Sequence, residues 1–120
     1  MPAAIQQPDI EDVTLEQVLA ALADPVRLEI VRLAADQPEQ ACNVFTSRIP
    51  KSTASHHWKV LREAGLISQR QAGTQRLNTL RYDELEARFP GLLPAVLDAA
   101  RQNGESPAMA AEPRRAKHPA

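Results

Sequence analysis

The spacing of apolar residues marks two helices in the first third of the chain. The first stripe has helical periodicity and consists of Leu15, Val18, Leu19 and Leu22. Thr14 and Gln17 have the spacing of a capping box, so this helix is predicted over 14–23. Asp24 and Pro25 then suit the N-cap and the first position of a second helix. This second helix is apolar on almost every side, and it is expected to be central to the core.

A longer helix is predicted from Lys51 to Ala64, and its two faces differ in chemistry. The apolar stripe is narrow and consists of Ala54, Trp58 and Leu61. The opposite face is rich in hydrogen-bond donors, and it presents Lys51, Ser52, Ser55, His56, Lys59 and Arg62. A helix that buries one side and shows donors on the other is suited to a DNA major groove.

The residues around this helix predict how it begins and ends. Residues 36–40 are a polar loop, and residues 42–47 form at best a short, weak helix. A turn at 48–50 separates that short helix from the long one, and Pro50 marks the turn. Gly65 stands where the C-terminal cap of the long helix belongs.

A hairpin is predicted directly after the long helix. Its strands lie near 66–71 and 75–81, and residues 72–74 form the turn between them. Leu77 and Leu80 are three residues apart, which breaks the alternation of a regular strand. The second strand is therefore expected to contain a bulge or to start late.

The two ends of the chain look unlike the middle. Residues 82–85 suggest a helical turn, and a last amphipathic helix is predicted over 90–102. Residues 1–12 and 103–120 lack apolar periodicity and are predicted to be disordered. One domain is therefore expected over 13–102.

The order of elements predicts a mainly α fold with a β-hairpin, namely a winged helix-turn-helix with four helices, the hairpin and a last helix. The third and fourth helices make the helix-turn-helix, and the hairpin is the wing. The tip of the wing carries Arg70, Gln71, Thr74, Gln75 and Arg76. A basic tip can reach DNA phosphates along the backbone or in the minor groove. An ordinary solvated hairpin is the alternative.

Charged residues are unevenly distributed along the chain, and their distribution bears on the partner that the protein binds. The net charge of the whole chain is only −1. Residues 1–47 contain eight acidic and two basic residues, whereas residues 48–81 contain one acidic and seven basic residues. The basic block coincides with the long helix and the hairpin, which favours nucleic acid as the partner.

Composition limits the classes of fold and of function that the chain can have. The chain has 120 residues and 3% aromatic residues, which favours one small helical domain over a β-sandwich. Its single cysteine, Cys42, suits a reducing compartment, and no signal peptide or membrane span is evident. A cytoplasmic protein is therefore expected. Paired carboxylates beside a pocket and glycine-rich phosphate loops are missing from the sequence, so no enzyme activity is expected.

Four segments together resemble a known family of bacterial regulators. They are A-L-A-D-P-V-R-L-E-I-V-R-L at 21–33, K-S-T-A-S-H-H-W-K-V-L-R-E-A-G-L-I at 51–67, R-Q-A-G-T-Q-R-L-N-T-L-R at 70–81 and R-F-P-G-L-L at 88–93. The chain resembles the ArsR/SmtB family of winged-helix repressors over about residues 14–100. R-F-P-G-L-L resembles a branch that is not known chiefly for sensing metals.

The resemblance implies roles for residues of the long helix and the wing. Ser52, Thr53, Ser55 and His56 match positions that contact bases and phosphates, and Lys51 and Lys59 are expected to hold phosphates. His57 is either packed or in contact with DNA, Trp58 is expected in the core rather than stacked on a base, and Arg62 serves DNA or an ion pair. The wing residues expected to contact DNA are Arg70, Thr74, Gln75 and Arg76.

The resemblance also implies a homodimer that is joined through the first and last helices. The expected seam consists of Leu15, Val18, Leu19, Leu22, Leu92, Leu93, Val96 and Leu97. A twofold dimer places two reading helices about one DNA turn apart, so the operator is expected to be an imperfect palindrome. The alternative is that these faces close only the core of one chain.

The signal that controls such a regulator is not evident. Relatives that sense metals use a Cys-x-Cys or a set of His and acidic residues, whereas this chain has Cys42 alone and Asp98 without a histidine beside it. No metal or other cofactor is therefore expected. Two alternatives stay open, namely a thiol-responsive repressor that switches through Cys42 and a winged-helix module that binds protein. Arg114, Arg115 and Lys117 in the tail either touch phosphates or are solvated.

Overall fold

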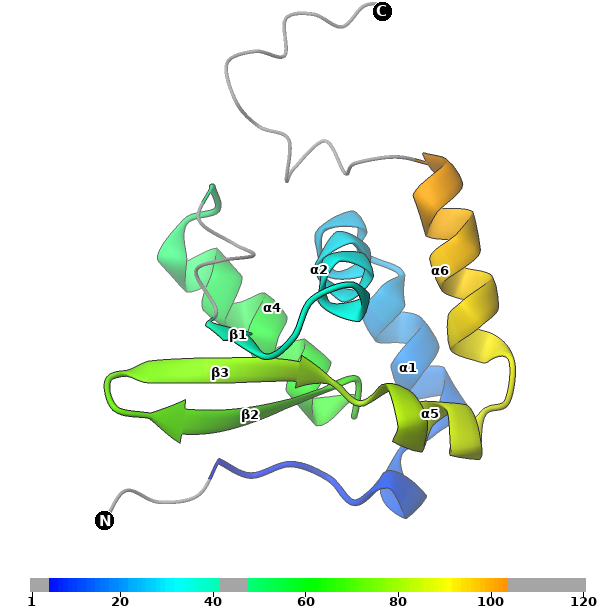
Figure 1. Ribbon diagram of the computed structural model, residues 1–120, viewed down its shortest axis with the longest axis horizontal. Coiled ribbons are helices and arrows are strands. Elements are labelled where there is room, and N and C mark those ends of the chain that lie inside the picture. Colours follow the sequence, from blue (N-terminus) through cyan, green and yellow to red (C-terminus); the bar gives the residue numbers. More distant parts are fainter. Residues whose placement is uncertain (1–4, 42–47, 104–120) are drawn as a thin grey trace, which may run out of the picture.

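The computed structural model describes residues 5–41 and 48–103 (Figure 1). The helices are η1 (Ile10–Asp12), α1 (Leu15–Leu22), α2 (Pro25–Ala35), α4 (Lys51–Glu63), α5 (Tyr82–Arg88) and α6 (Leu92–Asn103). The strands are β1 (Gln40–Ala41), β2 (Ile67–Ala72) and β3 (Gln75–Leu80). The fold is the predicted winged helix-turn-helix, with β1 before α4 and a second helix after the hairpin in addition to the predicted elements. The short helix predicted over 42–47 and the tail at 104–120 lie outside the described residues.

The predicted caps set the starts of α1 and α2. The Thr14 hydroxyl accepts from the Gln17 backbone N–H, and the Gln17 side chain accepts from the Thr14 N–H, which confirms the capping box. The Asp24 carboxylate accepts from the N–H groups of Val26 and Arg27 at 2.8 and 3.1 Å. These bonds satisfy backbone donors that the first turn of a helix otherwise leaves unpaired.

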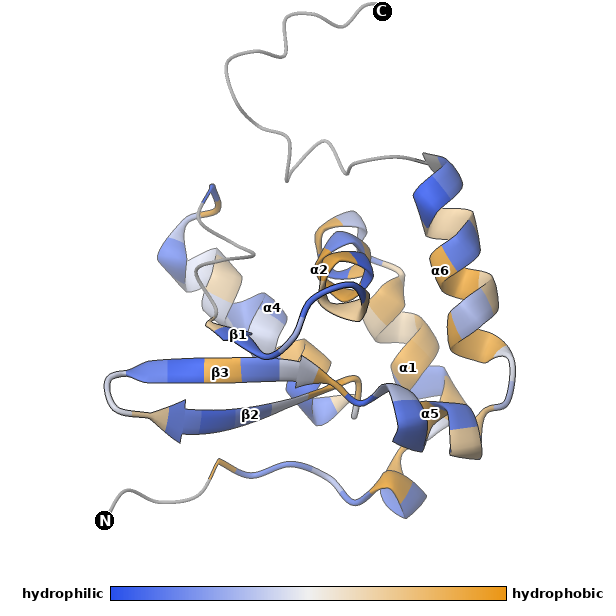
Figure 2. Ribbon diagram, in the orientation of Figure 1, coloured by the Kyte–Doolittle hydropathy of each residue, from blue (hydrophilic) through white to orange (hydrophobic). Residues whose placement is uncertain are grey.

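The core lies where α2 meets the other helices and the root of the wing. Ile30 and Val31 of α2 are fully buried, as predicted for a central helix. They share one apolar cluster with Val18, Trp58, Leu61, Leu66, Ile67, Leu85 and Leu93. Figure 2 shows the contrast between the largely hydrophobic α1 and the mostly hydrophilic wing.

The wing is a three-stranded antiparallel sheet in the order β1-β3-β2, rather than the isolated hairpin that the sequence predicts. Gln40, which was assigned to a polar loop, pairs with Asn78 in this sheet. The pairing of β2 with β3 is continuous from Ile67↔Leu80 to Ala72↔Gln75, so the expected bulge is absent from the hairpin. The inward-facing residues of β3 are Asn78 and Leu80, whereas Leu77 belongs to the other face and is half-buried.

The N-terminal segment departs from the prediction of disorder. Residues 5–12 lie against the domain, and they include the single turn η1. The Gln7 side chain bonds to the backbone of Gln69 in β2, and the guanidinium of Arg81 donates to the Pro8 carbonyl at 2.9 Å. In Figure 1 this segment runs beside β2. The polar side chain of Gln7 bonds to the sheet, which apolar periodicity cannot reveal.

The last part of the chain is more helical than predicted. The turn expected at 82–85 extends to Arg88 as α5, and α6 begins at Leu92. Gly91 adopts a φ of +85° between the two helices. The last helix packs against α2 and α5.

The turn between α4 and the wing depends on Gly65. Its N–H donates to the Arg62 carbonyl at 3.1 Å, and the Leu66 N–H donates to the Leu61 carbonyl at 3.0 Å. These two bonds and the φ of +81° at Gly65 are those of a Schellman motif. A Cβ at this position would overlap the buried side chain of Val13.

The Gly65→Ala substitution is therefore expected to destabilise the fold strongly. A left-handed backbone costs about 1–2 kcal/mol for a residue other than glycine. The overlap with Val13 adds about 1–3 kcal/mol, which is typical of an overpacked core. The free energy of unfolding should be measured by chemical denaturation. Gly73→Ala is the matched control, because Gly73 has a φ of +63° with open space around it. Equal losses in the two variants would contradict the role given to the contact with Val13.

Candidate nucleic-acid interface

The two faces of α4 separate as the sequence predicts. Ala54, Trp58 and Leu61 are buried, together with His57. The exposed face carries Lys51, Ser52, Thr53, Ser55, His56 and Lys59. Trp58 is 4% exposed, which confirms its assignment to the core. The helix therefore presents two lysines and several hydroxyl and imidazole groups to solvent over its first two and a half turns.

His57 belongs to the packed side of α4, which supports the packed alternative of the two that the sequence leaves open. It is 7% exposed, and its Nδ1 accepts a hydrogen bond of 3.2 Å from the Arg27 guanidinium. Arg27 also donates through Nε to the Ala21 carbonyl at 2.8 Å, so it joins α4 to the end of α1. Burial is the main cause that lowers the pKa of His57, and the charge of Arg27 adds to it, while Asp24 opposes it. The neutral ring is thus a structural acceptor.

Arg62 has a partner that the sequence analysis does not foresee. Its Nη1 donates to the Gln69 side-chain oxygen in β2 at 2.9 Å. The residue is half-buried, unlike the exposed basic residues at the start of α4. Arg62 therefore connects the reading helix to the wing, whereas the predicted alternatives were DNA or an ion pair.

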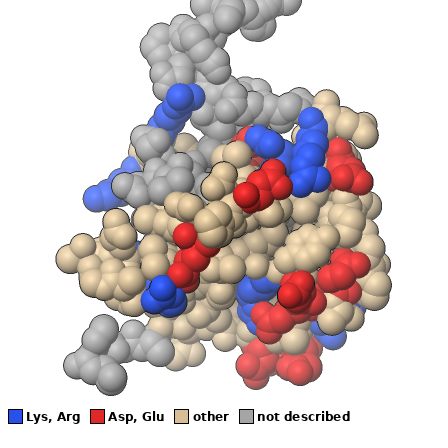
Figure 3. Space-filling model, in the orientation of Figure 1, with Lys and Arg blue, Asp and Glu red and all other residues tan. Residues whose placement is uncertain are grey.

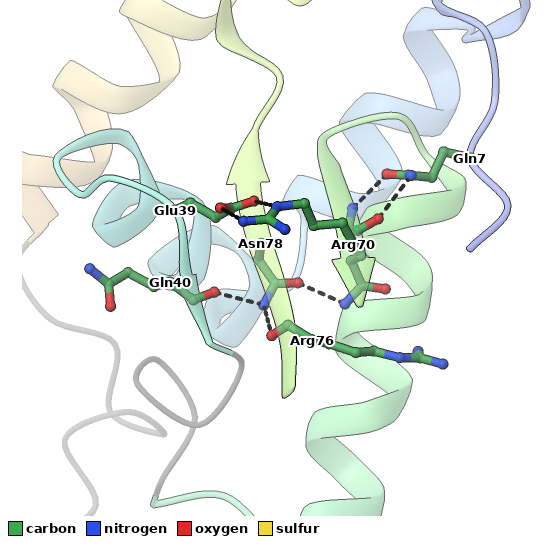
Figure 4. A network of polar contacts seen from close by, with 7 residues as sticks. Gln7, Glu39, Gln40, Arg70, Arg76 and Asn78 are labelled. Atoms are coloured by element: carbon green, nitrogen blue, oxygen red, sulfur yellow. Dashed lines mark hydrogen bonds and ion pairs between the residues drawn. The ribbon is translucent and has the colours of Figure 1, made fainter. Parts of the chain in front are cut away.

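The outer part of the wing keeps its polar residues in solvent. Thr74, Gln75 and Arg76 are exposed, and Figure 4 shows the Arg76 side chain pointing away from the sheet. Arg70 is exposed too, and it forms an ion pair with Glu39 through two contacts of 2.8 Å. The hydrogen bond from Arg70 is the main cause that lowers the pKa of Glu39. Glu39 is a residue that sequence reasoning missed, because 31 positions separate it from Arg70.

Acidic residues gather at the other end of the molecule. Glu11 and Asp12 belong to η1, and Asp83 and Glu84 belong to the first turn of α5. Figure 3 shows acidic side chains clustered over this end and a basic side chain near the wing. This separation follows the uneven charge along the sequence, and it leaves the α4–wing side as the one suited to a polyanion.

The leucine stripes of α1 and α6 are divided between the core and the surface. Val18, Leu22, Leu93 and Leu97 are at most 7% exposed in the single chain, which supports for these four the alternative that they close the core of one chain. They already pack on the core of their own chain. Leu15 and Leu19 are 42% and 45% exposed, and Leu92 and Val96 are half-buried. Only these four of the predicted seam residues offer apolar surface to a partner.

Two negative findings concern the described residues only. Within 5–41 and 48–103, no group of three or more His, Cys, Asp or Glu side chains is placed to hold a metal ion. None of the helices in those ranges is long and apolar enough to cross a membrane. Cys42 lies outside the described residues, so the thiol-switch alternative stays a prediction.

The helix-turn-helix order, the exposed donors of α4 and the adjoining wing define a winged helix-turn-helix protein. Residues 22–70 match the family model described as a helix-turn-helix domain. The chain is 37% identical to the HTH-type transcriptional regulator YceK of Bacillus subtilis, over 69% of this chain and 86% of that protein.

Solved structures agree with this class. One is the homodimeric winged helix-turn-helix DNA-binding domain Mb0332 of Mycobacterium bovis, a possible ArsR-family regulator, with 28% identity and a TM-score of 0.56 over 81% of this chain and 93% of that one. Another is a possible transcriptional regulator for arsenical resistance, with 31% identity and a TM-score of 0.54 over 76% of this chain and 98% of that one. The present chain belongs to the ArsR family of DNA-binding transcriptional regulators.

Proposed function

We propose that this regulator is a homodimeric repressor that binds an imperfect DNA palindrome, with α4 in the major groove and the wing on the adjoining backbone. The observation that carries the proposal is the exposed, donor-rich face of α4. Its packed face is closed by Trp58, Leu61 and the His57–Arg27 bond, so the helix has a fixed orientation in which to present that face.

The side chains on the exposed face divide by what they can bind. Ser52, Thr53, Ser55 and His56 are short or planar groups that can donate to or accept from base edges. Lys51 and Lys59 carry their charge on long flexible stems, which suits phosphates. Base contacts give specificity, and phosphate contacts give position and affinity.

The start of α4 supports a phosphate contact as well. The N-cap is Pro50, and no acidic residue lies in the first turn. Among the described residues no side chain caps this end. The backbone N–H groups of the first turn and the helix dipole therefore favour an anion at this end.

The wing supplies the second contact. Arg76 is exposed beside Thr74 and Gln75, so it can reach the sugar-phosphate backbone. Arg70 is held by Glu39, but exposed ion pairs contribute little free energy. A DNA phosphate can therefore compete with Glu39 for Arg70. In this proposal Glu39 orients Arg70 in the free protein, and the ion pair breaks when Arg70 binds a DNA phosphate.

Dimerisation through α1 and α6 is supported by the apolar surface that remains there. Leu15 and Leu19 are the large hydrophobic residues most exposed on α1, and Leu92 and Val96 are half-buried on α6. The similar domain Mb0332 is described as homodimeric. A twofold dimer sets the two α4 helices about one DNA turn apart, roughly 34–36 Å, which requires a palindromic operator.

The reading face is tested by the double substitution Ser55→Ala and His56→Ala. Both side chains are exposed, so folding and dimerisation should be unchanged. Removing each base contact should cost roughly 1–3 kcal/mol with the operator and little with unrelated DNA. Affinity for both duplexes can be measured by gel shift or fluorescence anisotropy.

Lys59→Ala is the contrasting variant on the same helix. Removing a phosphate contact should weaken both duplexes alike and lower the slope of affinity against salt by about 1. If the double variant instead weakens both duplexes equally, or binds the operator as the parent does, Ser55 and His56 do not read bases.

The seam is tested by Leu19→Glu. A charge in the apolar contact should convert the dimer to a monomer in analytical ultracentrifugation, with the fold retained because Leu19 is exposed in the single chain. Ala20→Glu is the matched control, since Ala20 is exposed and lies about 100° round the helix from Leu19. A dimer that survives Leu19→Glu would place the seam elsewhere.

A further inference from the structure

Two buried polar residues face each other inside the wing. Gln69 of β2 and Asn78 of β3 are paired in register and are 3% and 2% exposed. The Gln69 side-chain nitrogen donates to the Asn78 side-chain oxygen at 2.7 Å. Beyond them toward the tip, every described residue of the two strands is exposed or half-buried. The pair is therefore the last buried point of the wing before the residues that contact DNA in the proposed function.

The same two side chains reach the neighbouring elements on both sides. The Gln69 oxygen accepts from Arg62 of α4 at 2.9 Å, and the Asn78 nitrogen donates to the Gln40 carbonyl of β1 at 3.2 Å. Figure 4 shows Asn78 on the central strand β3, with Gln40 of β1 on one side and the strand that carries Arg70 on the other. A continuous line of hydrogen bonds thus runs from the reading helix through β2 and β3 to β1.

The backbone at Gln69 is held as well. The Gln7 side-chain oxygen accepts from the Gln69 N–H at 2.6 Å, and the Gln7 nitrogen donates to the Gln69 carbonyl at 3.0 Å. This side-chain amide satisfies the free edge of β2 in the way that a neighbouring strand would. Position 69 is consequently fixed by α4, by β3 and by the N-terminal segment at once.

We propose that Gln69 and Asn78 are positioning residues that tie the wing to α4 through Arg62, so that helix and wing meet DNA with a fixed mutual geometry. The proposal rests on the DNA contacts of α4 and the wing in the proposed function. An apolar pair would fill the same space without the cost of burying amides. What the amides add is direction, because hydrogen bonds hold their partners at defined distances and angles whereas apolar contacts do not.

The length of the wing beyond the pair explains why this matters for binding. A strand advances about 3.3 Å per residue, so the turn lies some four residues, or roughly 13 Å, beyond Gln69. Arg76 lies two residues beyond Asn78, or roughly 7 Å along the strand, and its carbonyl accepts from the Asn78 side chain at 3.5 Å, so a rotation at the pair displaces Arg76 from its phosphate. Arg62 acts here through Gln69, and its contribution to binding is to orient the wing.

The test combines the variant Gln69→Met/Asn78→Leu with Arg76→Ala. Replacing both partners by apolar side chains leaves no amide unpaired between them, but Arg62 and the Gln40 carbonyl each lose a hydrogen bond. The fold and the dimer should therefore be retained with a lower midpoint of thermal unfolding, and binding is compared well below that midpoint. Operator affinity should fall roughly tenfold, which is within the coupling range of residues in one hydrogen-bond network. The salt slope should become shallower by about 1 for each phosphate that the displaced wing no longer neutralises.

The decisive measurement is the energetic coupling between the Gln69–Asn78 pair and Arg76. Arg76→Ala should weaken operator binding in the parent and should add nothing to Gln69→Met/Asn78→Leu, because the wing is already displaced there. Ser68→Ala is the matched control, since Ser68 is half-buried on the other face of the same strand, next to Gln69, and is outside the proposed DNA contacts. In that background Arg76→Ala should keep its full effect.

Three outcomes separate the possibilities. Equal losses from Arg76→Ala in the parent and in Gln69→Met/Asn78→Leu overturn the positioning role and leave the proposed function standing. No effect of Arg76→Ala in the parent overturns the wing contact and this proposal with it. If the apolar variant does not fold, Arg62→Met takes its place in the double-mutant cycle with Arg76→Ala. Additive losses with Arg76→Ala then show a direct DNA contact at Arg62 and overturn the proposal, whereas non-additive losses support it.

Discussion

The turn at Gly65 is the constraint on which the reading surface depends. It ends α4 with the two hydrogen bonds of a Schellman motif and starts β2 two residues later. The left-handed φ requires glycine, and Val13 occupies the space where a side chain would be. Because this short turn is the covalent link between helix and wing, its geometry and the Arg62–Gln69 bond together set the angle between them. The N-terminal segment takes part through Val13 and Gln7, so it belongs to the folded domain rather than to a tail.

The chemistry of α4 follows from a division between its two faces. The packed face is closed by apolar residues and by a neutral histidine that accepts from Arg27, while the exposed face keeps hydroxyl, imidazole and ammonium groups in solvent. Burial lowers the pKa of His57, which keeps it in the acceptor state that Arg27 needs. Two adjacent histidines thus differ in role, since about 100° of helix rotation separates them.

The sequence predicted those elements whose signals are local. These signals act on backbone or side chains within a few residues. They are the helix caps at Thr14 and Asp24, the apolar stripe of α4 and the glycine after it. Features that depend on distant partners were missed. Strand β1 is two residues long, and the partners of His57 and Arg70 lie 30 and 31 positions away. An amphipathic stripe also looks the same whether it packs in the core of one chain or at a dimer interface. The sequence therefore assigns four residues to a partner chain although their own chain covers them, namely Val18, Leu22, Leu93 and Leu97.

The central claim is that α4 and the wing together form the DNA-reading surface of this ArsR-family protein. The most direct measurement is a titration of 15N-labelled protein with a duplex selected from random sequence for binding, followed by the backbone amide resonances. The largest shifts should fall in residues 51–59 and 70–76, with small changes at the acidic end formed by η1 and α5. Largest shifts at η1 and α5, with α4 unchanged, would contradict the central claim.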